Sequence, residues 1–209
     1  MCTLRPIASH AEVLDYHRFR HAIYATSDQR EFLAGPEGFD TDEYDATALH
    51  LGWYEHDRLV GCVRLLNPIK ARHPLHLFKD LGEGPLRDAA LDLVAQARKD
   101  GKPVSEVSRL CLAREKRSLA TTRRFVLAII ATAHRYGRDH CVFTCDAPHA
   151  AFWQRMGFAV VDGFAGYARP RGMHPGYLLR GTYADLLKKN RADLQALGFL
   201  MLGSLKVAA

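Results

Sequence analysis

The sequence predicts an α/β (α+β) domain built around a mixed, largely antiparallel sheet. Two runs of alternating residues, 46–55 and 58–66, flank a short turn and predict an antiparallel hairpin early in the chain. A helical pattern at 86–99 and an apolar strand at 104–113 then begin an alternation of helices and strands. A doubly wound parallel sheet fits less well, because the hairpin comes early and no glycine-rich phosphate loop follows the first strand.

The remaining elements rest on local signals. Ser9 and Glu12 form a capping box that begins a helix running to about residue 25. Ser118 is expected to cap the longest apolar helix, which ends at Gly137. The other expected elements are strands at 3–8, 140–145, 158–161 and 177–179, helices at 150–156 and 182–197, and loops at 26–44 and 67–85.

Composition indicates a single domain over 1–209, whose last part, 182–209, is a helix and a tail. The chain is long enough for one substantial core, and its 48% hydrophobic and 25% charged residues are ordinary for a globular protein. No signal-peptide pattern opens it, and the longest apolar stretches, 125–133 and 198–207, are too short or interrupted to span a bilayer. We therefore expect a cytoplasmic protein whose tail packs on the domain rather than on a membrane.

Cysteine content and charge narrow the environment and the partners. Five cysteines without paired spacing fit a reducing compartment. The net charge of +6 suggests an anionic partner. Nucleic acid is one candidate, an acidic carrier protein or a phosphate-bearing cofactor is another, and a merely solvated basic face is the alternative. The basic residues that gather near the start of the helix after residue 118 are Arg114, Lys116, Arg117, Arg123 and Arg124.

The most informative segment is Glu106-Val107-Ser108-Arg109, inside the apolar strand at 104–113. A core strand rarely carries a carboxylate, a hydroxyl and a guanidinium so close together, because unpaired buried charge is costly. Strand alternation places Glu106 and Ser108 on one sheet face and Arg109 on the other, unless a bulge intervenes. The segment is therefore expected to be paired, to line a site, or both.

Two roles are open for each charged residue near this strand. Glu106 is the best general-base candidate, acting directly or through a water, because burial raises the pKa of a carboxyl group. It could instead form a structural ion pair with Arg64 or Arg109. Those arginines could bind a substrate carboxylate bidentately or order Asp42 and Asp45. The two aspartates share a face if the loop is locally helical, and otherwise cap the loop.

Several segments together carry a family resemblance. They are Arg20-His21-Ala22-Ile23-Tyr24, Asp42-Glu43-Tyr44-Asp45, Gly61-Cys62-Val63-Arg64-Leu65-Leu66, Phe78 and Glu106-Val107-Ser108-Arg109. Each motif is weak alone, but their order and spacing together are specific. Over roughly residues 14–112 the chain resembles the acyl-homoserine lactone synthases and the related long-chain N-acyl amino acid synthases.

The resemblance implies a GNAT-like three-layer α/β/α fold and an N-acyltransferase activity. The enzyme would move a fatty acyl group from acyl carrier protein to the amine of an amino acid. No cofactor would be bound permanently, because the donor is an acyl-phosphopantetheine thioester. Glu106 and Ser108 would be catalytic, and the basic residues near residue 118 would hold the carrier protein or its phosphopantetheine. The residues implied to bind substrate are Arg20, Asp42, Asp45, Arg64, Phe78, Arg109, Leu110 and Leu112.

Departures from the family pattern bear on the acceptor and the donor. No convincing tryptophan occupies the loop after Tyr24, where homoserine lactone enzymes usually have one, which disfavours S-adenosylmethionine as acceptor. The turn at 113–120 lacks the glycines with which acyl-CoA-dependent GNAT enzymes hold a pyrophosphate, which favours a carrier-protein donor. An acyl-homoserine lactone synthase, an acyl-CoA-dependent enzyme and a catalytically silent binding module are the alternatives.

Metal chemistry is not expected from this sequence. The metal-capable side chains that cluster in one stretch are His140, Cys141, Cys145, Asp146 and His149. A Cys-x3-Cys pair inside a strand is mostly core, and the histidines elsewhere are scattered along the chain.

Overall fold

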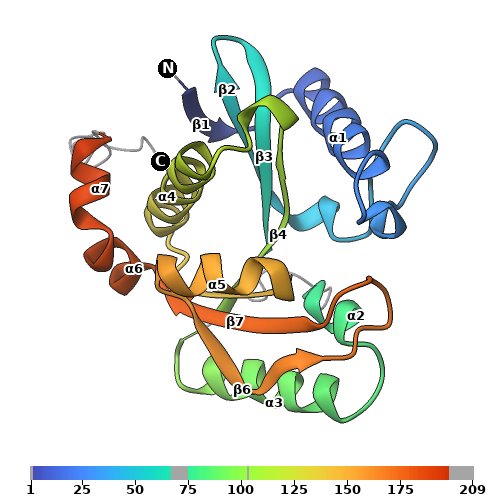
Figure 1. Ribbon diagram of the computed structural model, residues 1–209, viewed down its shortest axis with the longest axis vertical. Coiled ribbons are helices and arrows are strands. Elements are labelled where there is room, and N and C mark those ends of the chain that lie inside the picture. The colour runs from blue at the N-terminus through green and yellow to red at the C-terminus, as the bar shows by residue number, and fades with distance from the viewer. Residues whose placement is uncertain (1, 67–74, 103, 198–209) are drawn as a thin grey trace.

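One seven-stranded sheet organises the described part of the chain, residues 2–66, 75–102 and 104–197 of the computed structural model (Figure 1). Its strands are β1 (Cys2–Pro6), β2 (Leu49–Glu55), β3 (Arg58–Leu66), β4 (Val104–Leu112), β5 (His140–Asp146), β6 (Ala159–Tyr167) and β7 (Gly176–Thr182). They lie in the order β1-β2-β3-β4-β5-β7-β6, and only β4 and β5 are parallel neighbours. The predicted class and the mixed, largely antiparallel sheet are confirmed.

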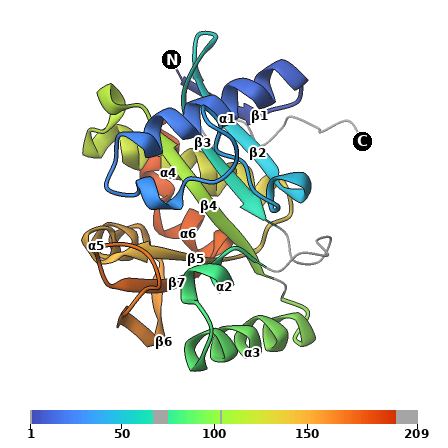
Figure 2. The ribbon, with the colours of Figure 1, turned by 90° about the vertical axis from the view of Figure 1, so that its right-hand side faces the viewer.

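Helices cover both faces of this sheet, so the domain has three layers. The helices are α1 (His10–Ala25), α2 (Leu77–Leu81), α3 (Pro85–Lys99), α4 (Leu119–Arg135), α5 (Ala147–Met156), α6 (Tyr183–Lys189) and α7 (Arg191–Ala196). Helices α1, α2 and α3 lie on one face, and α4, α5 and α6 lie on the other (Figures 1 and 2). The layers have the expected α/β/α arrangement.

Helix α1 begins as its sequence predicts and presents one charged side chain to the sheet. Ser9 Oγ accepts a hydrogen bond from the Glu12 amide, and the Glu12 carboxylate accepts one from the Ser9 amide. Four-residue spacing then places Tyr16, Arg20 and Tyr24 on the buried face of the helix. The two tyrosines pack in a small apolar cluster against the sheet, so Arg20 is carried into the interior with them.

A β-bulge in β4 decides which way its polar side chains point. Ser108 pairs with Arg64 and Cys111 pairs with Cys62, so β4 uses one more residue than β3 over the same stretch. Arg109 has a φ of 52°, a left-handed conformation that costs a non-glycine residue roughly 1–2 kcal/mol. The prediction from strict alternation, that Arg109 faces away from Ser108, is therefore wrong. The extra residue brings both side chains to the α1 face.

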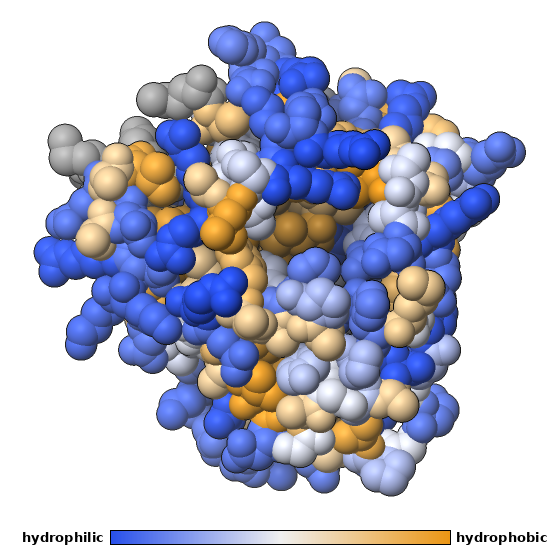
Figure 3. All heavy atoms as spheres, viewed as in Figure 1, coloured by the Kyte–Doolittle hydropathy of each residue, from blue (hydrophilic) through white to orange (hydrophobic). Residues whose placement is uncertain are grey.

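Strands β4 and β5 separate soon after they begin. Only residues 104–106 of β4 pair with residues 140–142 of β5, although β4 continues to Leu112. Strand β5 stays paired with β7 along its whole length, so the two halves of the sheet diverge. Figure 3 shows a hollow with hydrophobic atoms at its bottom near the centre of this view, above α5, where β4 leaves the lower half.

Element boundaries differ from the predictions where short turns compete with longer elements. Strand β2 begins at Leu49 rather than residue 46, because Asp45–Thr47 forms a 3-10 turn. Helix α2 lies inside the segment predicted as loop, and α5 begins earlier than predicted. Strands β6 and β7 are longer than the apolar runs that predicted them.

The C-terminal helix is interrupted at Asn190, which separates α6 from α7. The Asn190 side-chain amide donates to the carbonyl oxygens of Leu186 and Met156, so the break is tied to the domain. The predicted tail at 198–207 and residues 67–74 of the predicted loop lie outside the described residues. Within the described ranges, no helix has the length and apolar character needed to cross a membrane.

Candidate active site

A network of buried ion pairs joins α1, the loop at 40–45 and the central strands. Its members are Arg20 of α1, Arg64 of β3, Arg109 of β4, and Asp40, Asp42 and Asp45 of the loop. No side chain among these six is more than 10% exposed. Three positive and three negative charges cancel, which is a condition for burying so much charge together.

These six groups close a ring in which guanidinium and carboxylate groups alternate. Around the ring the contacts are Arg20–Asp40 at 2.6 Å, Asp40–Arg109 at 3.3 Å, Arg109–Asp42 at 3.3 Å, Asp42–Arg64 at 2.5 Å, Arg64–Asp45 at 2.9 Å and Asp45–Arg20 at 2.7 Å. Each member therefore has two partners of opposite sign. If the loop left the sheet, the three arginines of the ring would lose their carboxylate partners.

Asp42 and Asp45 of this ring stay ionised. Burial alone would raise the pKa of Asp45, but the Arg20 and Arg64 guanidinium groups outweigh it and hold the pKa well below its usual range. The pKa of Asp42 is likewise lowered, because Arg64 overcomes the effect of burial. Neither carboxylate is suited to carry a proton at neutral pH, so both act as charge partners.

Glu106 lies on the same sheet face but has no guanidinium partner within ion-pair distance among the described residues. Its side chain is 1% exposed, its Oε2 accepts a hydrogen bond from the Leu77 amide at 3.0 Å, and its Oε1 lies 3.9 Å from His76 Nδ1. Burial raises the pKa of Glu106 to about 7, although His76 and the Leu77 amide favour the charged form. A carboxyl group that titrates near neutral pH can accept and release a proton during a reaction.

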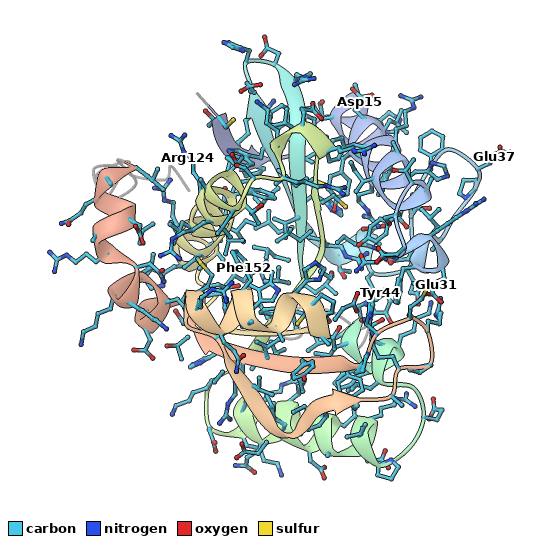
Figure 4. All side chains as sticks on the ribbon, in the orientation of Figure 1. Asp15, Glu31, Glu37, Tyr44, Arg124 and Phe152 are labelled. Atoms are coloured by element: carbon cyan, nitrogen blue, oxygen red, sulfur yellow. The ribbon has the colours of Figure 1, made fainter. Side chains whose placement is uncertain are left out.

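Tyr44 and Phe78 form an apolar wall beside Glu106. Both side chains are buried in one hydrophobic cluster with residues of α2. The centres of the Tyr44 and His76 rings lie 5.2 Å apart, with the rings edge to face. Figure 4 shows Tyr44 next to α2. The Arg64 guanidinium carbon lies 5.6 Å from the Tyr44 ring centre. Arg64 Nη2 is buried without a hydrogen-bond partner among the described residues, so a donor is left over for a ligand.

An apolar cavity lies on the opposite face of the sheet, where β4 and β5 separate. It is narrow, with about 10 Å³ of space between the sheet, α4 and α5 that a water-sized sphere can occupy. Val107 and Leu110 of β4 and Phe143 of β5 line it, and the remaining lining residues are Val126, Ile129, Ile130, Trp153, Phe158 and Tyr183. The bulge therefore gives β4 a polar site on one face and an apolar cavity on the other within a few residues.

The basic residues predicted to bind the donor differ in how they are held. Lys116 pairs with Glu55 at 2.7 Å, and Arg117 Nε donates to the Leu112 carbonyl oxygen at 2.9 Å. Arg123 contacts Asp193 and donates to Asn190. Arg114 and Arg124 have no hydrogen bond or ion pair to any residue that the structure describes. Arg124 is labelled on α4 in Figure 4.

Sequence analysis missed two members of this site. Asp40 is fully buried and links Arg20 to Arg109, and its position in an already acidic loop was the available signal. His76 stands next to Glu106, but no sequence spacing connects them because their contact is tertiary. The short helix α2, which carries the contact, lies in a segment whose glycines and prolines predict a loop.

A splayed mixed sheet with a bulged central strand and a buried carboxyl group at the splay defines a GNAT-fold N-acyltransferase. The sequence matches the family of the N-acyl amino acid synthase FeeM over residues 10–180. The chain therefore belongs to this family, and it is an acyltransferase. The family expectation from the sequence motifs is confirmed.

Solved structures share the same fold. A CoA-dependent acyl-homoserine lactone synthase, BjaI, matches with a TM-score of 0.67 at 18% identity, covering 92% of this chain and 89% of its own. FeeM from uncultured soil microbes matches with a TM-score of 0.58 at 16% identity, covering 90% and 94%. The acyl-homoserine lactone synthase LasI matches with a TM-score of 0.60 at 16% identity, covering 88% and 89%. No curated protein sequence matches the chain.

Metal-binding side chains do not gather anywhere in the described residues. No group of three or more histidine, cysteine, aspartate or glutamate side chains in residues 2–66, 75–102 and 104–197 could hold a metal ion. Cys141 and Cys145 of β5, which belong to the metal-capable stretch, lie in the apolar core instead.

Breaking the ring should destabilise the fold far more than breaking a surface pair on the same helix. Arg20→Met is expected to lower the free energy of unfolding by about 3–5 kcal/mol, because buried carboxylates lose a partner. Arg18→Met is the matched control, since Arg18 pairs with Asp15 through side chains that are 57% and 69% exposed. That change should cost less than about 1 kcal/mol. Urea denaturation of both variants measures the difference, and equal losses would contradict the role of the ring.

Replacing the desolvated carboxyl group should stabilise the protein at high pH. The pKa of Glu106 is raised from 4.5 to about 7, so the unfolded state releases this proton first as pH rises. The free energy of unfolding of the wild type therefore falls by about 3 kcal/mol as the pH rises from about 4.5 to about 7. At lower pH the carboxyl group is protonated in both states, and its burial as a charge costs nothing. Glu106→Gln should remove this loss.

Urea denaturation from about pH 5 to about pH 8.5 measures the effect, as the difference in unfolding free energy between wild type and Glu106→Gln. The difference should grow with pH in favour of the variant. Glu115→Gln, at an exposed position, should track the wild type throughout. A Glu106→Gln difference that did not change with pH would show that the carboxyl group is not desolvated as described.

Proposed function

We propose that this protein is an N-acyl amino acid synthase that transfers a fatty acyl group from acyl carrier protein to the amine of an amino acid. The observation that carries the proposal is Glu106, a buried carboxyl group that titrates near neutral pH. It lies between the ring of buried ion pairs on one face of β4 and the splay that leads to an apolar cavity on the other. Membership of the FeeM family sets the reaction class.

Glu106 acts as the general base in this proposal. An amine attacks a thioester only after losing a proton, and a base whose pKa is close to the working pH removes it most effectively. Ser108 Oγ accepts a hydrogen bond from Arg64 Nε at 3.0 Å, so its hydroxyl proton is free to stabilise the tetrahedral intermediate. Backbone amides at Leu110 and Leu112, next to the splay, would hold the thioester carbonyl.

The acceptor carboxylate would bind at Arg64. Its Nη2 is buried and unpartnered among the described residues, and burial of an unpaired donor is costly unless a ligand completes it. The ring fixes this guanidinium through Asp42 and Asp45 and keeps its charge constant, which pre-organises the donor. Tyr44 and Phe78 would form the apolar side of the same pocket, while Arg20 and Arg109 support it through the ring.

The acyl chain would enter at the narrow cavity between β4 and β5, which would widen to admit it. All of its lining side chains are apolar or aromatic, which suits a hydrocarbon chain and excludes the polar acceptor. The aromatic rings of Phe143, Trp153 and Phe158, which line the cavity, contact one another edge-on. We infer that these rings limit the length of the chain that the enzyme accepts.

Acyl carrier protein is the proposed donor because of the charges around the start of α4. Arg114 and Arg124 lack intramolecular partners in the described residues and can face an acidic protein. The α4 N-terminus is capped by its own Ser118, which accepts a hydrogen bond from the Thr121 amide. Lys116, Arg117 and Arg123 are held by neighbouring groups, so they would shape the surface more than they would grip a partner.

A product assay tests the function directly. Wild-type protein with a long-chain acyl thioester of carrier protein and a mixture of amino acids should release N-acyl amino acids, detected by mass spectrometry. Glu106→Gln should lower turnover by about 100-fold or more at neutral pH, as expected for loss of a general base. The wild-type rate should rise with pH through about 7, because Glu106 must be ionised to accept a proton. Unchanged turnover in Glu106→Gln would remove its assignment as the base.

The same assay separates the alternative reactions. Supplying S-adenosylmethionine and finding acyl-homoserine lactone with methylthioadenosine would identify a lactone synthase instead. Equal turnover of acyl-CoA and of the carrier-bound thioester would favour a CoA-dependent enzyme. Binding of thioester without its consumption would identify a non-catalytic module.

Reversing the two unpartnered charges tests the donor. The double variant Arg114→Glu and Arg124→Glu should raise the KM for acyl carrier protein by roughly tenfold or more, because like charges would then face an acidic partner. The KM for acyl-phosphopantetheine, which lacks the protein, should stay unchanged. Arg98→Glu on the exposed face of α3 is the control and should alter neither value. Equal effects on both donors would contradict a carrier-protein surface here.

A further inference from the structure

His76 stands between two buried carboxyl groups. Its Nδ1 lies 3.9 Å from Glu106 Oε1 and 3.6 Å from Asp80 Oδ2. The His76 side chain is 10% exposed, whereas that of Glu106 is 1% exposed. His76 is therefore the titratable group that links the candidate base with the outside of the site. The distance to Glu106 exceeds a hydrogen bond, as is common for proton-transfer pairs before substrate binds.

Asp80 is fixed by groups from two other parts of the chain. Its Oδ2 accepts a hydrogen bond from Thr144 Oγ1 of β5 at 2.7 Å and lies 3.7 Å from Arg169 Nη2. Arg169 also contacts Asp146 at the end of β5, and Gln29 donates to the same Asp146 at 2.9 Å. Burial would raise the pKa of Asp80, but His76, Thr144 and Arg169 outweigh it and lower the pKa. A fixed, ionised Asp80 holds the His76 ring in place.

We infer that His76, oriented by Asp80, is a positioning residue that carries the proton away from Glu106 in each turnover. This inference rests on the proposed function, in which Glu106 is the base. Glu106 takes a proton from the acceptor ammonium group, leaving a neutral amine and a neutral carboxyl group. The carboxyl group passes that proton to the unprotonated Nδ1 of His76, and the imidazolium releases its Nε2 proton to water. The ring then returns to the Nε2–H tautomer by exchange with water before the next turnover. Amide and free thiol are then formed from amine and thioester, and one proton leaves per ammonium consumed.

The need for such a route follows from burial. A carboxyl group that is 1% exposed cannot exchange its proton with bulk water directly, and its Oε2 is already engaged by the Leu77 amide. Only Oε1 is left to meet both the acceptor and the relay. Because Leu77 follows His76 in the chain, the start of α2 both orients the base and offers it an exit for protons.

Several charged and titratable groups face this pair. Arg64 approaches Glu106 from β3 and favours its charged form, and Asp80 opposes it from α2. The Tyr44 hydroxyl and the Cys141 thiol stay neutral, because burial raises the pKa of each to about 12. Arg169 faces Asp80 from the segment before β7. Tyr44, Cys141 and Asp80 therefore do not compete for the proton that Glu106 passes to His76.

His76→Asn is the central variant, because an amide keeps a polar group beside Asp80 but neither accepts nor carries a transferable proton. We expect kcat to fall about 10- to 100-fold while KM for both substrates stays within about twofold, as for loss of a proton-transfer step. In His76→Ala, added imidazole should restore part of kcat. His134→Asn, at an exposed position of α4, is the control and should retain wild-type kinetics. Unchanged kcat in His76→Asn, or a loss confined to KM without imidazole rescue, would overturn the relay.

A second measurement does not depend on activity. The infrared carbonyl band of protonated Glu106, identified by its absence in Glu106→Gln, follows its titration in the folded protein. Because His76 favours the charged form of Glu106, the pKa of Glu106 should rise above about 7 in His76→Asn and stay unchanged in His134→Asn. An unshifted titration would show that the two groups are not coupled and would overturn the inference. Absence of N-acyl amino acid from the wild type would instead refute the proposed function.

Discussion

The ring of alternating guanidinium and carboxylate groups is the interaction on which the rest of the structure depends. It connects α1, the loop at 40–45 and the two central strands, which lie far apart in the sequence. Any one of its charges, buried alone, would cost several kcal/mol. These segments are therefore stable together or not at all. In the completed ring each guanidinium group is already paired with aspartates. Glu106, on the same sheet face, is therefore buried without a guanidinium partner among the described residues.

One extra residue in β4 gives this face its composition. Without the bulge, Arg109 would point into the apolar cluster under α4 instead of toward the aspartates of the loop. With it, Arg109 completes the ring and Leu110 turns to the cavity. The left-handed conformation at Arg109 costs roughly 1–2 kcal/mol, which two charge contacts within a buried ring can offset. The bulge and the ring therefore depend on each other.

The sequence was sufficient for elements whose signals are local and insufficient for those that depend on tertiary contact. The capping box of α1, the hairpin of β2 and β3, and the α/β class follow from spacing and turn residues. The direction of Arg109 could not be predicted, because bulge position depends on pairing with β3. Helix α2 could not be predicted either, since its few residues pack through Leu77 and Phe78 into the core. For the same reason the sequence did not predict that His76 lies next to Glu106 or that Asp40 links Arg20 to Arg109.

Asp45 and Glu106 show how one sheet face separates structural from reactive carboxyl groups. Burial acts on both in the same direction, so the difference lies in their partners. Asp45 meets two guanidinium groups and stays ionised, whereas Glu106 meets one amide and one imidazole, which offset only part of its desolvation. The partners of Glu106 come from the start of α2, and those of Asp45 come from α1 and β3. A site that needs a fixed charge and a movable proton side by side is thus assembled by giving each carboxyl group a different neighbour.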